Sequence, residues 1–406
     1  MSAKGSNLSE ARLRIEPATA NGLSMALLGL GVVGLGASAY AIFTSAGADK
    51  LTALTSYLVA FMYVATIGVG CMFFAMLQHL VGARWSVAIR RIAENFGAPL
   101  WVLIPLFIPL AVNIPTLYSE WAGPTPLAEV VEAKGSYLNL NFFYIRAAIY
   151  LVAWAALGYV VHKRSVQLDE SGDPGLVVKL RRMAPPGVLV FGITLTFAGF
   201  DWLMSLDPKW ASTMFGVYVF AGTFLSGMAM IALTGRILHG RGYLRGVVNE
   251  EHFHDLGKMI FGFIVFWAYI AFSQFFLIWY ANIPEETLWF RKHWTYEDQD
   301  WSTVGWALIG LQFLFPFFAI LSRHAKRNAA IMLPIAALLV GMHYVDLFWV
   351  VMPLFRKVAS IEWTDAAALV GMAGVYMGLV VRHFGAAPLI PVKDPFLPDS
   401  LEYDNG

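Results

Sequence analysis

The sequence is poor in cysteine. Cys71 is the only cysteine among the 406 residues, and it lies inside an apolar run. One cysteine cannot supply a disulfide framework, a CxxCH haem attachment or a cysteine cluster for zinc or iron–sulfur binding. We therefore interpret Cys71 as a small buried hydrophobic residue and expect the chain to bind no such group of its own.

Charged residues are also scarce. They make up 14% of the chain, whereas a soluble domain carries roughly 25%. The formal net charge is +1, and the basic residues are scattered, so we expect no nucleic-acid partner. Because 58% of the residues are hydrophobic, the chain needs lipid to cover its surface.

Ten apolar stretches are long enough to cross a membrane, which takes about 20 residues. They lie at 22–44, 51–80, 98–118, 138–162, 187–206, 212–235, 258–282, 301–322, 329–353 and 364–382. This pattern predicts an all-α polytopic membrane protein with about ten transmembrane helices. The first stretch is not followed by a small-residue cleavage site, so we expect a permanent helix whose glycines suit close helix packing. These are Gly29, Gly31, Gly34 and Gly36.

Lys and Arg residues predict the orientation, because they resist translocation when they lie in short loops. With an inside N-terminus, 20 of the 28 Lys and Arg residues fall in inner segments and seven in outer loops. Both termini are therefore predicted to be cytoplasmic. The segment 384–406 is rich in proline and acidic residues, and we expect it to be extended and ordered only where a partner holds it.

The second to fifth spans weakly resemble the sixth to ninth. The fourth helix of each group holds an aspartate seven residues before a proline, Asp201 with Pro208 and Asp346 with Pro353. A repeat of four spans is even, so the two copies are parallel repeats related by an axis along the membrane normal. We expect two four-helix bundles with peripheral first and last helices. The predicted units are a cytoplasmic segment 1–21, a first helix 22–50, bundles 51–211 and 212–357, a last helix 358–383 and a cytoplasmic tail 384–406.

Ionisable side chains inside a span are costly and indicate functional sites. Arg146, Asp201, His343 and Asp346 fall at one depth in the outer half of the membrane, and Gln274 lies at a similar depth. His343 and Asp346 share one helix face, where a carboxylate can orient an imidazole. Two interpretations stay open. An Arg146–Asp201 ion pair and a His343–Asp346 hydrogen bond only satisfy buried groups, or these residues form a proton relay.

On the inner side, His252, His254 and Asp255 cluster just before the seventh span. They are candidates for collecting protons for such a relay, and a solvated loop is the alternative. His343 is the only histidine well inside a span, so paired haem b ligands are not expected. On the outer side, the tryptophans of loop 283–300 are expected to form an interfacial aromatic belt.

Three stretches resemble a known family. They are FAGFDWLMSLDPKWASTMFGVY (197–218), HFHDLGKMIFGFIVFWAYIAFSQFFLIWYANIPEE (252–286) and GMHYVDLFWVVMP (341–353). On a ten-span chain with paired bundles they resemble the ActF family. ActF subunits are integral membrane subunits of the bacterial alternative complex III, a quinol oxidoreductase, and are related to the NrfD-type quinol-oxidising subunits.

The resemblance implies a complex in the bacterial cytoplasmic membrane. Partner subunits would carry haems c and iron–sulfur clusters, a sister NrfD-like subunit would oxidise quinol such as menaquinol, and electrons would pass to cytochrome c or a terminal oxidase. An ActF-type chain would be a non-catalytic subunit that supports its sister and offers a proton path, with a second quinone site as a further option. A secondary transporter and a purely structural scaffold are the alternatives. The prolines of the third span have no equivalents in the seventh, which disfavours the transporter.

Overall fold

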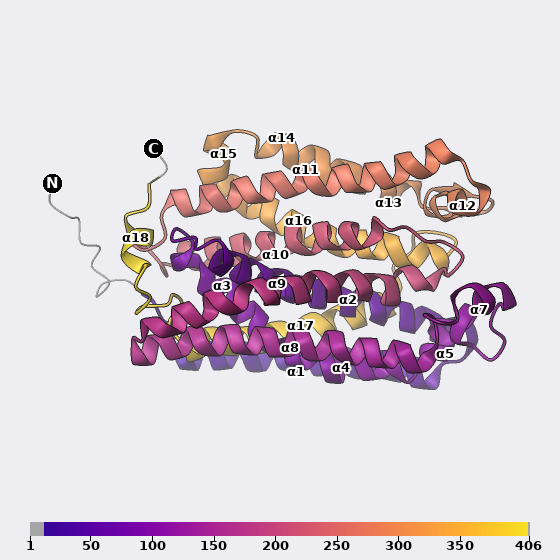
Figure 1. Ribbon diagram of the computed structural model, residues 1–406, viewed down its shortest axis with the longest axis horizontal. Coiled ribbons are helices and arrows are strands. Elements are labelled where there is room, and N and C mark those ends of the chain that lie inside the picture. The colour runs from indigo at the N-terminus through magenta and orange to yellow at the C-terminus, as the bar shows by residue number, and fades with distance from the viewer. Residues whose placement is uncertain (1–11, 405–406) are drawn as a thin grey trace.

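A computed structural model describes residues 12–404 as a bundle of long helices (Figure 1). In this part of the chain, ten helical segments are long and apolar enough to cross a membrane, which confirms the predicted all-α polytopic fold. Most of the predicted segment 1–21, including Lys4 and Glu10, lies outside the described residues. The ten segments are α1 (Pro17–Thr44), α2 (Gly47–Leu80), α3–η1–α4 (Val87–Gly97, Ala98–Val102, Leu103–Ala111), α8 (Leu140–Ser171), α9–η2 (Pro174–Trp202, Met204–Leu206), α10 (Phe215–Gly240), α11 (Glu250–Ala281), α13–η3–α14 (Ser302–Ala307, Leu308–Leu314, Phe315–Ala319), α16–η4 (Ala329–Val351, Met352–Leu354) and α17 (Trp363–Ala386).

Short elements join the spans at the two ends of the bundle (Figure 1). We name these ends inner and outer after the predicted orientation. The outer end holds α5 (Ile114–Leu117), α6 (Ser119–Ala122), α7 (Ala128–Lys134), α12 (Pro284–His293) and the antiparallel pair β1 (Thr295–Tyr296) and β2 (Gln299–Asp300). The inner end holds α15 (Arg323–Arg327) and α18 (Leu397–Leu401).

The centre of the bundle is formed by α2 and α10, which pack against each other. In their most apolar stretches, 94% and 83% of the residues are buried, as expected of helices that are hydrophobic on all sides. The corresponding fractions are 28% for both α1 and α11 and 22% for the segment from α13 to α14. These helices on the periphery of the bundle therefore leave most of their apolar surface for lipid or partner chains. The division into bundles 51–211 and 212–357 stays a prediction.

Helix α1 packs closely on α17, at two of the four predicted glycines. A Cβ atom at Gly34 would lie 2.5 Å from the backbone nitrogen of Gly371, and one at Gly31 would lie 2.4 Å from that of Val375. Only glycine permits so close an approach of two helix backbones. At Gly36, by contrast, a Cβ atom would meet open space.

Three spans begin far earlier than predicted. The third begins at Val87 instead of 98, the fifth at Pro174 instead of 187 and the seventh at Glu250 instead of 258. The prediction placed the charged residues at these positions in loops, whereas α9 and α11 start there with side-chain caps. The Asp173 side chain accepts a hydrogen bond from the backbone nitrogen of Gly175 at the start of α9, and Asn249 caps α11 in the same way.

The tail 384–406 is not an extended segment that waits for a partner, so that prediction is wrong for its described residues. It forms α18 and packs on the inner end of the bundle, with Leu389 fully buried. Asp394 pairs with Arg90 at 2.6 Å. The chain itself therefore supplies the contacts that order the tail.

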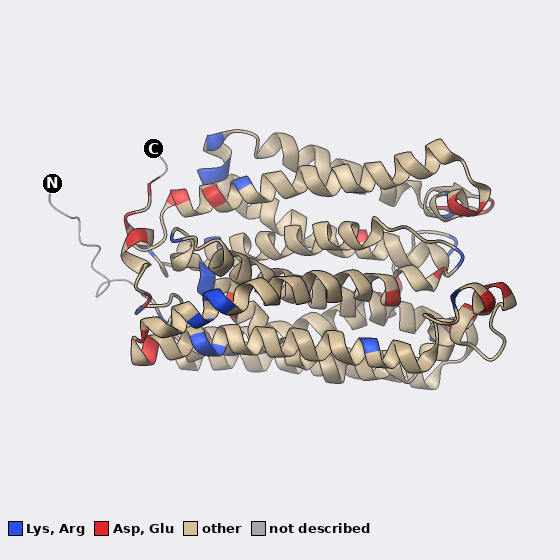
Figure 2. Cartoon of the chain, viewed as in Figure 1, with Lys and Arg blue, Asp and Glu red and all other residues tan. Residues whose placement is uncertain are grey.

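Charge is distributed unevenly along the bundle. Most of the Lys and Arg residues lie toward the inner end of the bundle, where α15 and α18 are found (Figure 2). The backbone nitrogen of Leu389 donates to the carbonyl of Leu13 at 2.7 Å, so the first and last described segments lie at the same end. That this end faces the cytoplasm stays a prediction from the charge distribution.

Candidate functional site

Asp346 is buried in α16, facing α10 and α11. One carboxylate oxygen accepts a hydrogen bond from the Tyr218 hydroxyl, and the other accepts one from Nε1 of Trp267 at 3.1 Å. The buried aspartates Asp201 and Asp365 each pair with an arginine, whereas Asp346 has no such partner in the described part of the chain. A buried carboxylate without a counter-cation is costly to keep ionised, and proton uptake removes that cost. Asp346 is therefore suited to proton exchange.

His343 lies one turn before Asp346 and faces the same space. Its Nε2 lies 2.7 Å from the Thr66 hydroxyl oxygen, while Nδ1 has no hydrogen-bond partner among the described residues. The predicted shared face is correct. The predicted direct hydrogen bond to Asp346 is absent from the described residues, because the Asp346 carboxylate is turned toward the donors on α10 and α11.

A small cavity separates the two side chains. It measures about 10 Å³ and is lined by His343, Asp346, Thr66 and Tyr218, among others. This volume is roughly what one water molecule needs. A Cβ atom at Gly222 would lie 3.3 Å from His343 Cε1 and 3.5 Å from an Asp346 oxygen, so the glycine leaves room for the cavity.

Arg146 and Asp201 form the predicted ion pair between α8 and α9. Two guanidinium nitrogens donate to the two carboxylate oxygens, at 2.7 and 2.9 Å. Tyr150 donates a further hydrogen bond to Asp201 at 2.8 Å, and the guanidinium lies over the Tyr137 ring at 3.9 Å from its centre. This bidentate, enclosed geometry stabilises the charged forms of both partners.

The four residues predicted in one layer form two separate groups. Within residues 12–404 no hydrogen bond or ion pair joins Arg146 or Asp201 to His343 or Asp346. Leu203, two residues after Asp201, lines the small cavity. A relay through all four residues is therefore not a continuous hydrogen-bonded chain in this structure.

The inner cluster lies on the first turns of α11, not in a loop before it. His252 is fully buried, and its Nε2 lies 3.1 Å from the hydroxyl oxygen of Ser400 in the tail. Tyr403 donates to Asp255, and His254 is buried in the same turn. The solvated-loop alternative is thus wrong, because the tail covers this cluster. Its role in collecting protons stays a prediction.

A second buried charge cluster at the inner end was missed by the sequence analysis, which counted its arginines as loop residues. Glu94 accepts from Arg90 at 3.2 Å and from Arg91 at 2.9 Å, and Arg91 also lies 3.0 Å from Asp169. Arg90 reaches Asp394 of the tail as well. The opposite charges at spacings of three and four residues were the available signal, since such pairs face each other on a helix.

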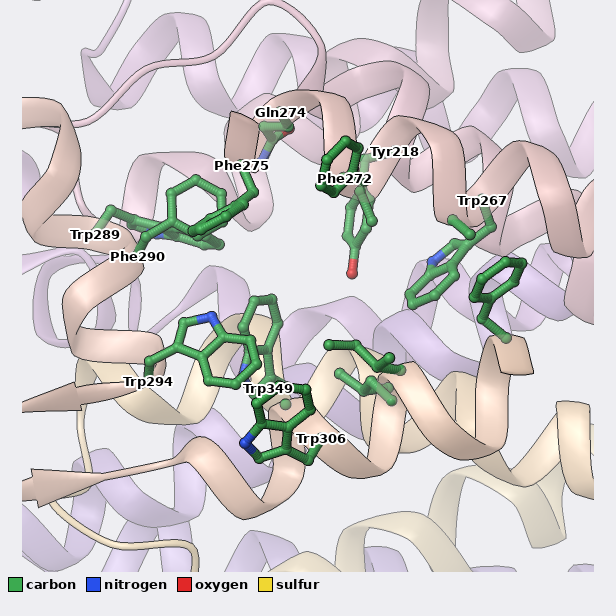
Figure 3. A pocket seen from close by; sticks show the side chains of 16 residues that line it. Tyr218, Trp267, Phe272, Gln274, Phe275, Trp289, Phe290, Trp294, Trp306 and Trp349 are labelled. Atoms are coloured by element: carbon green, nitrogen blue, oxygen red, sulfur yellow. The ribbon is translucent and has the colours of Figure 1, made fainter. Parts of the chain in front are cut away.

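A larger cavity, also missed, lies beside Asp346 between α10, α11, α12, α13, η3 and α16 (Figure 3). It measures about 610 Å³, and Tyr218 and Trp267, the two donors to Asp346, stand in its wall. Most of the other lining side chains are aromatic. They include Phe272, Phe275, Trp289, Phe290, Trp294, Trp306 and Trp349.

The tryptophans of loop 283–300 were predicted to form an interfacial aromatic belt, but Trp289 does not belong to one. Its side chain is buried and stacks on Trp210, with the ring centres 4.3 Å apart. His293 also stacks on Trp289, with the ring centres 3.6 Å apart. It is fully buried, and burial lowers the pKa of His293 to about 4. The loop after α11 therefore closes the outer end of the cavity.

Within residues 12–404 no group of three His, Cys, Asp or Glu side chains is placed to hold a metal ion. A scan against protein-family models finds no match to the chain, and a search of curated proteins finds no significant match. What the site can do is therefore argued from its geometry and from the three stretches quoted above.

Proposed function

We propose that this chain is a membrane subunit of a quinol-oxidising electron-transfer complex in the bacterial cytoplasmic membrane. It supports a sister NrfD-like subunit that oxidises quinol and provides a proton path, while haem c and iron–sulfur subunits carry the electrons toward cytochrome c or a terminal oxidase. The chain itself brings no haem, metal or iron–sulfur cluster.

The supporting observation is the convergence of the three family-like stretches on Asp346. Tyr218 is the last residue of the first stretch, Trp267 belongs to the second, and His343 and Asp346 belong to the third. In the structure both donors contact the carboxylate, and His343 faces it across the small cavity. The residues that carry the resemblance are thus the residues that surround the buried carboxylate without a counter-cation.

The proposed path runs through groups that can both donate and accept. A tyrosine hydroxyl, a threonine hydroxyl and an imidazole each do so, whereas an indole only donates. Asp346 exchanges a proton with Tyr218 on one side and with His343 on the other, and Thr66 continues the path from His343. The Trp267 indole then fixes the carboxylate without carrying the proton. Asp201, held by Arg146, takes a structural role.

The scaffold alternative predicts that the carboxylate of Asp346 is as inert as that of Asp201. A secondary transporter would need the large cavity as its substrate site. The aromatic lining of that cavity does not suit a charged solute, because a desolvated charge needs a paired or polar partner.

The test compares Asp346→Asn with Asp201→Asn, the same substitution in a paired aspartate. Each variant is purified with its co-purifying subunits, and the yield of complex, quinol oxidation and proton release are measured. We expect Asp346→Asn to assemble normally and to slow proton release, since an amide cannot titrate, and Asp201→Asn to lower the yield. Normal proton release in an intact Asp346→Asn complex would favour the scaffold. Absence of haem c and iron–sulfur subunits from the wild-type preparation would refute the proposed complex.

A further inference from the structure

The large aromatic cavity has a form that suits a ligand arriving from the membrane. Its volume of about 610 Å³ falls in the usual range for small-molecule sites, about 300–1,000 Å³. Phe272 and Trp306 stand at its rim and are 63% and 64% exposed, on two spans that leave most of their surface outward. The cavity therefore opens on the outward-facing side of two segments that are apolar enough to cross a membrane.

The walls favour a flat ring. Side chains from α11, α12, η3 and α16 present aromatic faces and edges to the cavity, and the Tyr218 ring stands between them (Figure 3). Aromatic groups attract one another in offset or edge-to-face arrangements. The wall formed by η3 is a π-helix, a wide turn that is frequent at functional sites.

Two polar groups in the wall determine which polar substituents a ligand ring can have. The Tyr218 hydroxyl already donates its only proton to Asp346, so toward the cavity its oxygen can only accept. The Gln274 amide oxygen accepts from Ser212 at 3.4 Å, and its amide nitrogen has no partner among the described residues. The matching ligand has a hydroxyl that donates and a second oxygen that accepts.

We propose that this cavity binds the ring of a lipid-soluble hydroquinone, whose hydroxyl donates to Tyr218 and whose second oxygen accepts from Gln274. A hydroquinone is flat, apolar over both faces and carries oxygens at opposite edges, as these walls require. The bound hydroxyl is then connected to Asp346 through one tyrosine. The choice of a hydroquinone among flat phenols rests on the proposed function, whereas the binding geometry rests on the cavity alone.

The test uses the full chain, purified without partners and placed in lipid nanodiscs. The probe is 2-methyl-1,4-naphthohydroquinone kept reduced, and binding is followed by quenching of tryptophan fluorescence, because five tryptophans line the cavity. We expect saturable quenching that Ala271→Trp abolishes by filling the cavity. The matched control Ala148→Trp, at an exposed position of α8, should bind as the wild type does.

A second pair of variants tests the hydrogen bond. Tyr218→Phe should weaken binding about tenfold, the usual effect of losing one buried hydrogen bond. Tyr269→Phe, on an exposed tyrosine of α11, should not. If Ala271→Trp and Tyr218→Phe bind the probe as the wild type does, the site is refuted. The site is also refuted if lipids with brominated acyl chains quench these tryptophans and the probe does not relieve that quenching, because lipid then fills the cavity. Either result leaves the Asp346 test of the proposed function intact.

Discussion

Replacing Arg146 by alanine should strongly destabilise the chain. The substitution leaves the Asp201 carboxylate buried, with the Tyr150 hydroxyl as its remaining side-chain donor. Removing one partner of a buried ion pair costs about 3–5 kcal/mol, because the other charge stays desolvated. Tyr150→Phe removes one neutral donor to the carboxylate and should cost less, about 1.5–3 kcal/mol.

The double variant Arg146→Met with Asp201→Leu separates the ion pair from the packing of its side chains. Buried pairs replaced by apolar residues of similar volume are often no less stable than the original. We therefore expect the double variant to recover most of the stability that Arg146→Ala loses. The free energy of unfolding, measured by SDS titration in mixed micelles, gives all four values on one scale.

Two results would contradict this reasoning. A loss of about 1 kcal/mol or less for Arg146→Ala would mean that water or the chain compensates the carboxylate at little cost. A double variant as unstable as Arg146→Ala would mean that the arginine acts through its stacking on Tyr137, not through its charge.

Two further predictions concern other parts of the chain. Gly34→Leu should separate α1 from α17, because even its Cβ atom would lie 2.5 Å from the Gly371 nitrogen. The control Gly36→Leu meets open space and should change nothing. Disulfide cross-linking of cysteines placed in both helices reports the contact. For His293, burial lowers the pKa in the folded chain to about 4, below the ordinary 6.5. The unfolded chain therefore takes up a proton first, and stability should fall by up to about 3 kcal/mol between pH 6.5 and 4. The slope of unfolding free energy against pH should shrink in His293→Gln, and an unchanged slope would assign it to other groups.

The ten spans could be predicted because length and apolarity alone decide whether a helix can cross a membrane. The beginning of α3 was missed, because part of the pairing of its arginines comes from Asp169 and Asp394, which are remote in sequence. Arg90 and Arg91 resemble loop residues until Glu94 and the tail are folded around them. Likewise the tail looks unstructured by composition, yet it is ordered by charges that were assigned to a loop.

The candidate site could also be predicted only in part. Ionisable residues stand out in an apolar span, so Arg146, Asp201, His343 and Asp346 were found, and the first two pair as expected. The donors to Asp346 were not found, because tyrosine and tryptophan are ordinary residues in a membrane helix. Nor was the aromatic cavity, which exists only where several helices that are separate in sequence meet.

The contact between Arg90 and Asp394 also affects how the protein is made. The two residues are 304 positions apart, so the ribosome has delivered nearly every span before the carboxylate that faces this arginine exists. Until then Glu94, four residues away, is the nearest acidic partner of Arg90, while Arg91 pairs with both Glu94 and Asp169. Asp394 is therefore the last charged partner that this buried cluster acquires as the chain is made.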